Sequence, residues 1–170
     1  MSYFENFQKI LYDPVGNNNP KLMTNIMKRV RMRANMKKEV VMLDPYDVQE
    51  NETPEIVADK HHGSPYYHWV VMLLNDISDV NHDWVKSTRQ LQKYLTDKYT
   101  VTQLSAAHHY EISQSSGDTS IKIQVLQGTS GATTVTNYEY EVALNEEKRS
   151  IDLLRNEYLG FFEDEFQNLV

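Results

Sequence analysis

The sequence predicts an α+β protein, and three local patterns support this fold class. A Ser/Thr–Pro pair, a common start of a helix, occurs at 53–54 and again at 64–65, with Gly63 between them as a helix stop. Apolar and polar residues alternate on both sides of a Ser-Ser-Gly-Asp turn within 110–125, which is typical of a β-hairpin. A Thr-x-x-Glu capping box at 136–139 predicts the start of another helix.

Residues 1–38 are predicted to form an aromatic arm followed by a basic helix. Turn-forming residues crowd the stretch 13–20, so we expect the arm to be held by burying its aromatic side chains in a partner or in the body of the protein. These aromatic residues are Tyr3, Phe4, Phe7 and Tyr12. Beyond the arm, Thr24 can cap a first helical turn. Apolar residues there recur every four positions and predict a helix from about 24 to 33, with Leu22, Ile26 and Val30 in one row.

The charge of the chain is divided unevenly. Residues 1–38 contain eight Lys or Arg and two acidic residues, a net charge of +6, whereas residues 39–170 contain nine basic and 22 acidic residues, a net charge of −13. Charges separated in this way favour contact with an acidic neighbour, and the interface candidates in the basic segment are Arg29, Arg31 and Arg33. The sequence leaves a second reading equally open, in which the basic helix folds onto the chain's own acidic body.

Residues 39–85 are predicted to form the structured core. The stretch 39–48 has an extended, apolar pattern in which Pro45 restricts a strand to a sheet edge or a bend. The two helices marked by the Ser/Thr–Pro pairs follow, and we expect Trp69 on the second of them to be buried. A polar loop then leads to Trp84, a large aromatic residue that we also expect to be buried.

Residues 86–136 are predicted to contain a connecting helix at 86–97, the β-hairpin, and a Gly/Ser/Thr-rich connector over 127–134. The remaining residues, 137–170, are predicted to be a mainly helical C-terminal segment. After a short strand-like alternation around Asp152, Asn156 can cap a final helix. The apolar residues that line one face of this helix are Tyr158, Leu159, Phe162, Phe166 and Leu169.

No group of residues in the sequence supports catalysis or cofactor binding. The chain has no cysteine, and histidines occur as the adjacent pairs 61–62 and 108–109, whose side chains diverge and cannot both reach one metal ion. The acidic stretch 76–83 lacks the Gly and Glu that a calcium loop requires. We therefore expect no enzymatic activity, no cofactor and no metal site.

Neither nucleic acid nor a membrane is predicted as a partner. The basic stretch 28–33 contains no aromatic residue on which a base could stack, and the whole chain carries a net charge of −7. The longest apolar run, Trp69–Leu74, is much shorter than the roughly 18 residues that a membrane-spanning helix needs.

The central segment resembles a LysM module. The matching positions follow the order of a Tyr-x-Val strand, a capped helix, a glycine turn, a second helix and a late asparagine, and they are Tyr46, Val48, Thr53, Ile56, Ala58, Gly63, Trp69 and Asn75. This resemblance implies a small β-α-α-β core, and it implies as an alternative function the binding of peptidoglycan or chitin. A LysM module alone would leave residues 1–38 and 137–170 without a role.

A second resemblance extends over nearly the whole chain. Blocks at 6–13, 26–31, 68–76 and 137–149, in this order and spacing, make the chain similar to the baseplate wedge protein 53 family of T4-like phages. The resemblance implies a structural component of a contractile tail baseplate in the virion, assembled in the host cytoplasm. It also implies that the chain bridges adjacent wedges into a six-fold ring, with other wedge subunits, neighbouring wedges and the central hub as partners in a hetero-oligomeric assembly.

Two sets of residues follow from these patterns, and neither set is catalytic or metal-binding. The expected core anchors are Tyr46, Thr53, Gly63, Trp69, Asn75 and Trp84. The protein-interface candidates are Tyr3, Phe4, Phe7, Arg29, Arg31, Arg33, Phe162 and Phe166.

Overall fold

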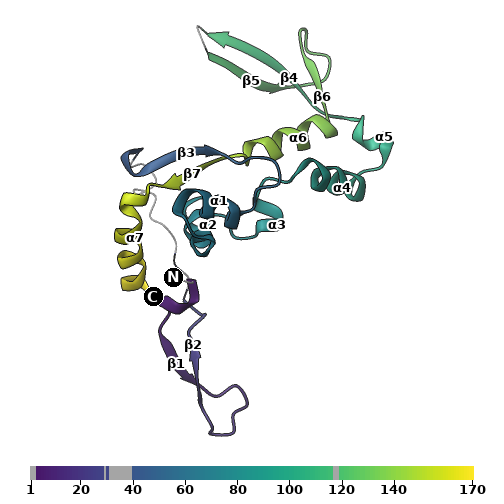
Figure 1. The fold of residues 1–170 in the computed structure, drawn as a ribbon. Helices are drawn as coiled ribbons and strands as arrows, with labels where there is room; N and C mark the ends of the chain where they lie inside the picture. The colour runs from purple at the N-terminus through teal and green to yellow at the C-terminus, as the bar shows by residue number, and fades with distance from the viewer. Residues whose placement is uncertain (1–2, 29, 31–39, 117–118) are drawn as a thin grey trace. The chain divides into compact units, whose positions relative to one another are not determined.

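The protein divides into two compact units, each described here by itself (Figure 1). A computed structural model describes residues 3–28, 30, 40–116 and 119–170. Unit 1 comprises Met1–Trp84 together with Ser150–Val170, and unit 2 comprises Val85–Arg149. Helices and small antiparallel sheets occur in both units, which confirms the α+β fold class.

Unit 1 begins with a short 3-10 helix, η1 (Tyr3–Asn6), and a β-hairpin of β1 (Lys9–Tyr12) and β2 (Lys21–Thr24). The prediction that a helix begins at about Thr24 is wrong, because Thr24 ends β2 and a turn follows it. Arg29, Arg31 and Arg33 of that predicted helix lie outside the described residues. Cross-strand pairing of Ile10 with Met23 and of Leu11 with Leu22 explains the difference, since the same apolar residues suit a strand once a partner strand is available.

The turn of this hairpin is built by residues that the sequence marks as turn formers. The carboxylate of Asp13 accepts the backbone N–H groups of Val15 (3.1 Å) and Gly16 (2.8 Å). Gly16 (φ 72°) and Asn18 (φ 57°) adopt the left-handed backbone that these two residue types tolerate. The chain can therefore reverse between 13 and 20, and the arm is a hairpin rather than an irregular segment.

The central helices form where the cap signals place them. After η3 (Val40–Met42) and β3 (Leu43–Asp47), helix α1 (Pro54–His62) starts with the Thr53 hydroxyl as its N-cap and ends at Gly63, whose φ is 74°. Ser64 caps the 3-10 turn η4 (Pro65–Tyr67), which continues into α2 (His68–Leu74). The predicted helices on both sides of Gly63 are confirmed.

Strand β7 (Ser150–Leu154) pairs antiparallel with β3 and completes the sheet of unit 1. Pro45 lies opposite Asp152 in this ladder, and the backbone N–H of Asp152 donates to the side-chain oxygen of Asn75 (2.9 Å). The Asn75 amide in turn donates to the Asp152 carbonyl (2.8 Å). Asn75 thus binds the outer edge of β7 much as a neighbouring strand would. The β3 strand and the helices α1 and α2 are thus completed by β7, a strand that follows unit 2 in the sequence. The resemblance to a LysM module stays a prediction.

The final helix, α7 (Asn156–Leu169), starts differently from the prediction. Arg155 occupies the N-cap position, and Asn156 is the first helical residue rather than the cap. The Asn156 side chain is engaged elsewhere, because its amide donates to the His61 carbonyl (2.7 Å) and its oxygen contacts the His62 Nδ1 (2.8 Å). These bonds tie the start of α7 to the end of α1.

The core of unit 1 is an aromatic cluster assembled from the two ends of the chain and from α2. Trp69 of α2 lies 4.6 Å from Phe166 and 5.9 Å from Phe162, ring centre to ring centre, and both phenylalanines are on α7. From the N-terminus, Tyr3 lies 5.7 Å from Trp69, and Phe7 lies 5.9 Å from Phe166. Other buried members of this core are Leu43, Val70, Leu74, Leu154 and Val170.

Unit 2 is a three-stranded sheet with helices. Helix α4 (Thr88–Lys98), which has a Ser87/Gln90 capping box, and the short α5 (Val101–Leu104) lead into the sheet. Its strand order is β5-β4-β6, with β4 (Ala107–Ser116), β5 (Thr119–Val125) and β6 (Thr133–Thr136) all antiparallel. Helix α6 (Asn137–Glu147) begins at the predicted capping box. Strand β6 begins in the segment expected to be an irregular connector, 127–134, and it was not predicted because its Thr-rich sequence carries no apolar alternation.

Trp69→Ala is expected to destabilise the protein by about 3–5 kcal/mol, because the ring is only 4% exposed and its loss would leave a cavity beside the rings of Tyr3, Phe162 and Phe166. Chemical denaturation followed by circular dichroism measures this change. Phe161→Ala on α7, whose ring is 57% exposed, serves as the control and should change stability by less than about 0.5 kcal/mol. A loss below about 1 kcal/mol for Trp69→Ala would contradict the burial of this ring.

Candidate assembly surfaces

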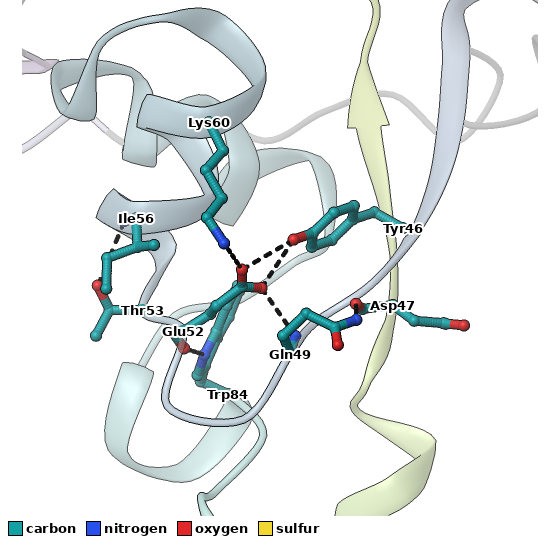
Figure 2. Close-up of polar contacts among 8 residues, drawn as sticks. All are labelled: Tyr46, Asp47, Gln49, Glu52, Thr53, Ile56, Lys60 and Trp84. Carbon is teal, nitrogen blue, oxygen red and sulfur yellow. Dashed lines mark hydrogen bonds and ion pairs between the residues drawn. The ribbon is translucent and has the colours of Figure 1, made fainter.

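A buried carboxylate, Glu52, organises the loop between β3 and α1 (Figure 2). Its carboxylate forms an ion pair with Lys60. It also accepts hydrogen bonds from the hydroxyl of Tyr46 (2.8 Å) and from the backbone N–H of Gln49 (2.8 Å). The Glu52 carbonyl also accepts the indole N–H of Trp84 (2.8 Å). The predicted anchors Tyr46 and Trp84 therefore meet at Glu52, a residue of the LysM-like segment that was not among the predicted anchors. Nothing in the local pattern distinguishes Glu52 from exposed acidic neighbours.

The electrostatics of this group are those of a stable ion pair. Burial by itself would raise the pKa of Glu52, but the hydrogen bonds from Lys60, the Gln49 N–H and Tyr46 lower that pKa overall. Burial and the neighbouring Glu52 carboxylate raise the pKa of Tyr46 to about 12. Both groups keep their ordinary charge near neutral pH, and their hydrogen bonds fix the loop between β3 and α1.

Unit 2 contains a similar group. The Glu141 carboxylate on α6 accepts Lys98 (2.6 Å) and the Tyr99 hydroxyl (2.8 Å), and this joins the end of α4 to α6. Burial would raise the pKa of Glu141, yet the hydrogen bonds from Lys98 and Tyr99 lower it overall. Asn145 on α6 also binds the backbone N–H (2.8 Å) and carbonyl (3.0 Å) of Lys86. Each unit is thus held by a buried polar group with complete partners.

The interface candidates named from the sequence fall into three groups. Phe7 (4% exposed), Phe162 (6%) and Phe166 (2%) lie in the core of unit 1, and Tyr3 packs against that core. Phe4 is 56% exposed and is available to a partner. Arg29, Arg31 and Arg33 lie outside the described residues. The arm is therefore anchored in the body of the chain through Tyr3 and Phe7, which was one of the two expected alternatives.

The β1–β2 hairpin carries a second, larger set of exposed apolar side chains, which the sequence reading assigned to the aromatic arm or to a helix or left without a role. We call it the hairpin surface; its members and their exposed fractions are Ile10 37%, Leu11 71%, Tyr12 54%, Val15 76%, Leu22 63%, Met23 44%, Ile26 69% and Met27 86%. Such a concentration of exposed apolar area on a short element is typical of a binding surface.

Unit 2 has its own exposed apolar face, on the β4–β5 hairpin. Residues paired across these strands share a face, and the pairs Tyr110–Val125, Ile112–Ile123 and Gln114–Ile121 lie on one side. We call this the sheet surface; Ile121 is 62% exposed and Ile123 is 41% exposed. The opposite side carries Glu111 and Lys122. Together with residues of α6, these two side chains line a cavity of about 510 Å³. The helix therefore covers the polar side of the sheet.

No group of three or more metal-ligating side chains occurs among the described residues. Within the same residues, no helix is both long and apolar enough to cross a membrane.

A comparison with protein families decides where the chain belongs. The family model described as base plate wedge protein 53 matches residues 2–118, which include the hairpin surface and the segment from β3 to α2. The chain belongs to the base plate wedge protein 53 family. This confirms the resemblance read from the sequence and gives the chain a structural role in a phage baseplate. No curated protein matches the chain.

The family match also locates what this member of the wedge protein 53 family shares with its relatives. The matched residues, 2–118, end within the β4–β5 hairpin, so β7 and α7 lie outside the match. Those two elements nevertheless complete the sheet and the aromatic core of unit 1. The matched residues alone therefore do not contain all the elements of unit 1.

Glu52→Gln is expected to lower the free energy of unfolding by about 1–3 kcal/mol at pH 7, because the ion pair with Lys60 and one acceptor for buried donors are lost. The folded-state pKa of Glu52 lies below its ordinary value of 4.5, so its contribution is present above that pH and is lost as the pH falls through the folded-state pKa. The gap between wild type and variant should accordingly close in acid. Denaturant titrations at pH 7 and pH 3.5 measure it, with exposed Glu165→Gln as the control; an equal gap at both pH values would contradict this role.

Lowering the pH from 7.5 to 5.5 is expected to destabilise unit 1 through His62. Burial lowers the pKa of His62, and its Nε2 atom is buried without a hydrogen-bond partner among the described residues. Below its ordinary pKa of 6.5 the unfolded chain takes up a proton that the folded chain resists, so stability falls as the pH falls.

His62→Gln should flatten the dependence of stability on pH in this range, where carboxylates titrate little. Denaturation midpoints at several pH values measure the slope, and His82→Gln, at an exposed site, is the control. An unchanged slope in the His62 variant would show that another group is responsible.

Proposed function

We propose that this chain is a connector that bridges adjacent baseplate wedges into the ring around the central hub, without catalysing a reaction. Membership of the base plate wedge protein 53 family is the observation that carries the proposal. Its partners would be other wedge subunits, neighbouring wedges and the hub, in a six-fold hetero-oligomeric assembly that forms in the host cytoplasm.

A connector needs two separate contact surfaces, and the exposed apolar residues support this requirement. The hairpin surface belongs to unit 1 and the sheet surface belongs to unit 2. Each unit also has its own core or buried polar group, so each surface is carried by a unit with its own fixed structure. One surface would bind the wedge that holds the chain, and the other would bind the next wedge.

A chain altered on the sheet surface alone should bind a wedge but fail to join it to the next. In Ile121→Ser with Ile123→Ser, two exposed apolar side chains are lost from that surface, while the hairpin surface is unchanged. Purified wedges that lack this protein are mixed with wild type or variant. Bound protein is measured by sedimentation, and closed rings are counted by electron microscopy.

Val101→Ser is the matched control, since Val101 is 83% exposed in unit 2 and lies on α5 rather than on the sheet. Wild type and control should close rings, and the sheet variant should give bound but open wedges. A normal ring yield from the sheet variant would contradict a second contact there. Failure of the wild-type chain to bind or join wedges would contradict the proposed function itself.

A further inference from the structure

The β1–β2 hairpin exposes apolar side chains on both of its faces. Residues paired across the strands share a face, so Ile10, Tyr12 and Met23 lie on one side, and Leu11 and Leu22 lie on the other. Leu11 and Leu22 are 71% and 63% exposed, and on the first face Tyr12 is 54% exposed. A surface that only lay flat on a partner would need one apolar face, whereas this hairpin has two.

An isolated two-stranded hairpin is also marginal in water, since such a ribbon gains stability mainly by packing against other elements. This hairpin has a well-formed turn and a continuous register from Lys9–Thr24 to Tyr12–Lys21, yet its side chains bury little against the rest of unit 1. The apolar area on both faces would be removed from water if the ribbon entered a cleft.

The charge of the hairpin indicates the chemistry of that cleft. Lys9, Lys21 and Lys28 are exposed and make no ion pair within the described residues. The acidic residue of this stretch, Asp13, is occupied in the turn, where its carboxylate accepts two backbone N–H groups. A surface of this kind is complementary to an apolar cleft with carboxylates at its rim.

We propose that the β1–β2 hairpin inserts, with both faces buried, into an apolar cleft rimmed by carboxylates on a neighbouring wedge subunit. This inference rests on the proposed connector function and names the partner of its hairpin surface. The partner is a different subunit rather than a second copy of this chain. A cavity of about 520 Å³ beside Trp69 and Met72, and the cavity of about 510 Å³ beside Glu111 and Lys122, are of the size that holds a small ligand and are too small for a two-stranded ribbon.

The test uses full-length protein and purified wedges that lack it, with binding measured by sedimentation or biolayer interferometry. Two double variants are made, one for each face of the hairpin. Leu11→Ser with Leu22→Ser changes one face, and Ile10→Ser with Met23→Ser changes the other. Each should weaken binding at least about tenfold, because each removes two large apolar side chains from a buried contact. Val101→Ser with Leu126→Ser is the matched control, since these residues are 83% and 85% exposed in unit 2.

A third variant, Lys9→Glu with Lys21→Glu, tests the charge. It should weaken binding at low salt by about tenfold or more, and the loss should shrink at about 0.5 M salt because ions screen exposed charges. Arg89→Glu with Lys93→Glu, on the exposed face of α4, makes the same change of charge away from the hairpin. Circular dichroism confirms that each variant folds.

Specific outcomes would overturn the inference while leaving the connector function intact. Wild-type binding that tolerates both face variants would remove the hairpin from the contact, and sensitivity to one face alone would mean that the ribbon lies flat. Tighter binding by the Lys-to-Glu variant would show a basic cleft. Dimerisation of the isolated chain that the Leu11/Leu22 variant abolishes would identify a second copy as the occupant, and retention on anionic vesicles that the same variant abolishes would identify a lipid surface.

Discussion

Unit 1 depends on the antiparallel pairing of β3 with β7, two strands that are separated in the sequence by unit 2. This pairing brings α7 to α2, where Phe162 and Phe166 pack on Trp69. The ladder leaves the outer edge of β7 without a strand, and the Asn75 amide binds that edge at Asp152. If β7 did not pair, the aromatic core would lose α7, and the Tyr3 and Phe7 rings would lose their contacts with Phe166.

Local signals were sufficient to predict the elements whose ends are fixed by their own residues. Thr53, Gly63 and Ser64 act through hydrogen bonds and backbone angles within a few residues, so α1 and α2 could be placed without knowledge of the fold. The β1–β2 hairpin and β6 could not, because a strand is defined by its partner. The residues from Lys21 to Thr24 show a helix-like spacing until Lys9–Tyr12 is placed beside them. Glu52 was missed for a related reason, since its partners converge only after β3 and α1 are packed.

Sequence also could not separate the apolar residues of the core from those of a binding surface. Phe161 and Phe162 are neighbours with the same side chain, yet Phe161 is 57% exposed and Phe162 is 6% exposed. Adjacent residues of an α-helix point in different directions around its axis, so the Phe162 ring lies in the Trp69 cluster while the Phe161 ring lies in solvent. In the same way, the aromatic arm that suggested an anchor for a partner is used largely inside the chain through Tyr3 and Phe7. The apolar residues left exposed are instead those of the hairpin that follows it.

The two buried carboxylates bear on how a small chain could hold separate surfaces in defined shapes. Glu52 joins β3, α1 and Trp84 in unit 1, while Glu141 joins α4 and α6 in unit 2, and each combines a lysine with a tyrosine hydroxyl. Buried ion pairs add little net stability compared with apolar packing, but their directional bonds disfavour alternative arrangements of the elements they join. A protein that exposes apolar residues on two faces would otherwise tend to bury them against itself. The two carboxylates hold the elements of each unit's body in one arrangement and so limit such a rearrangement, and the apolar residues of the hairpin and sheet surfaces stay exposed for a partner.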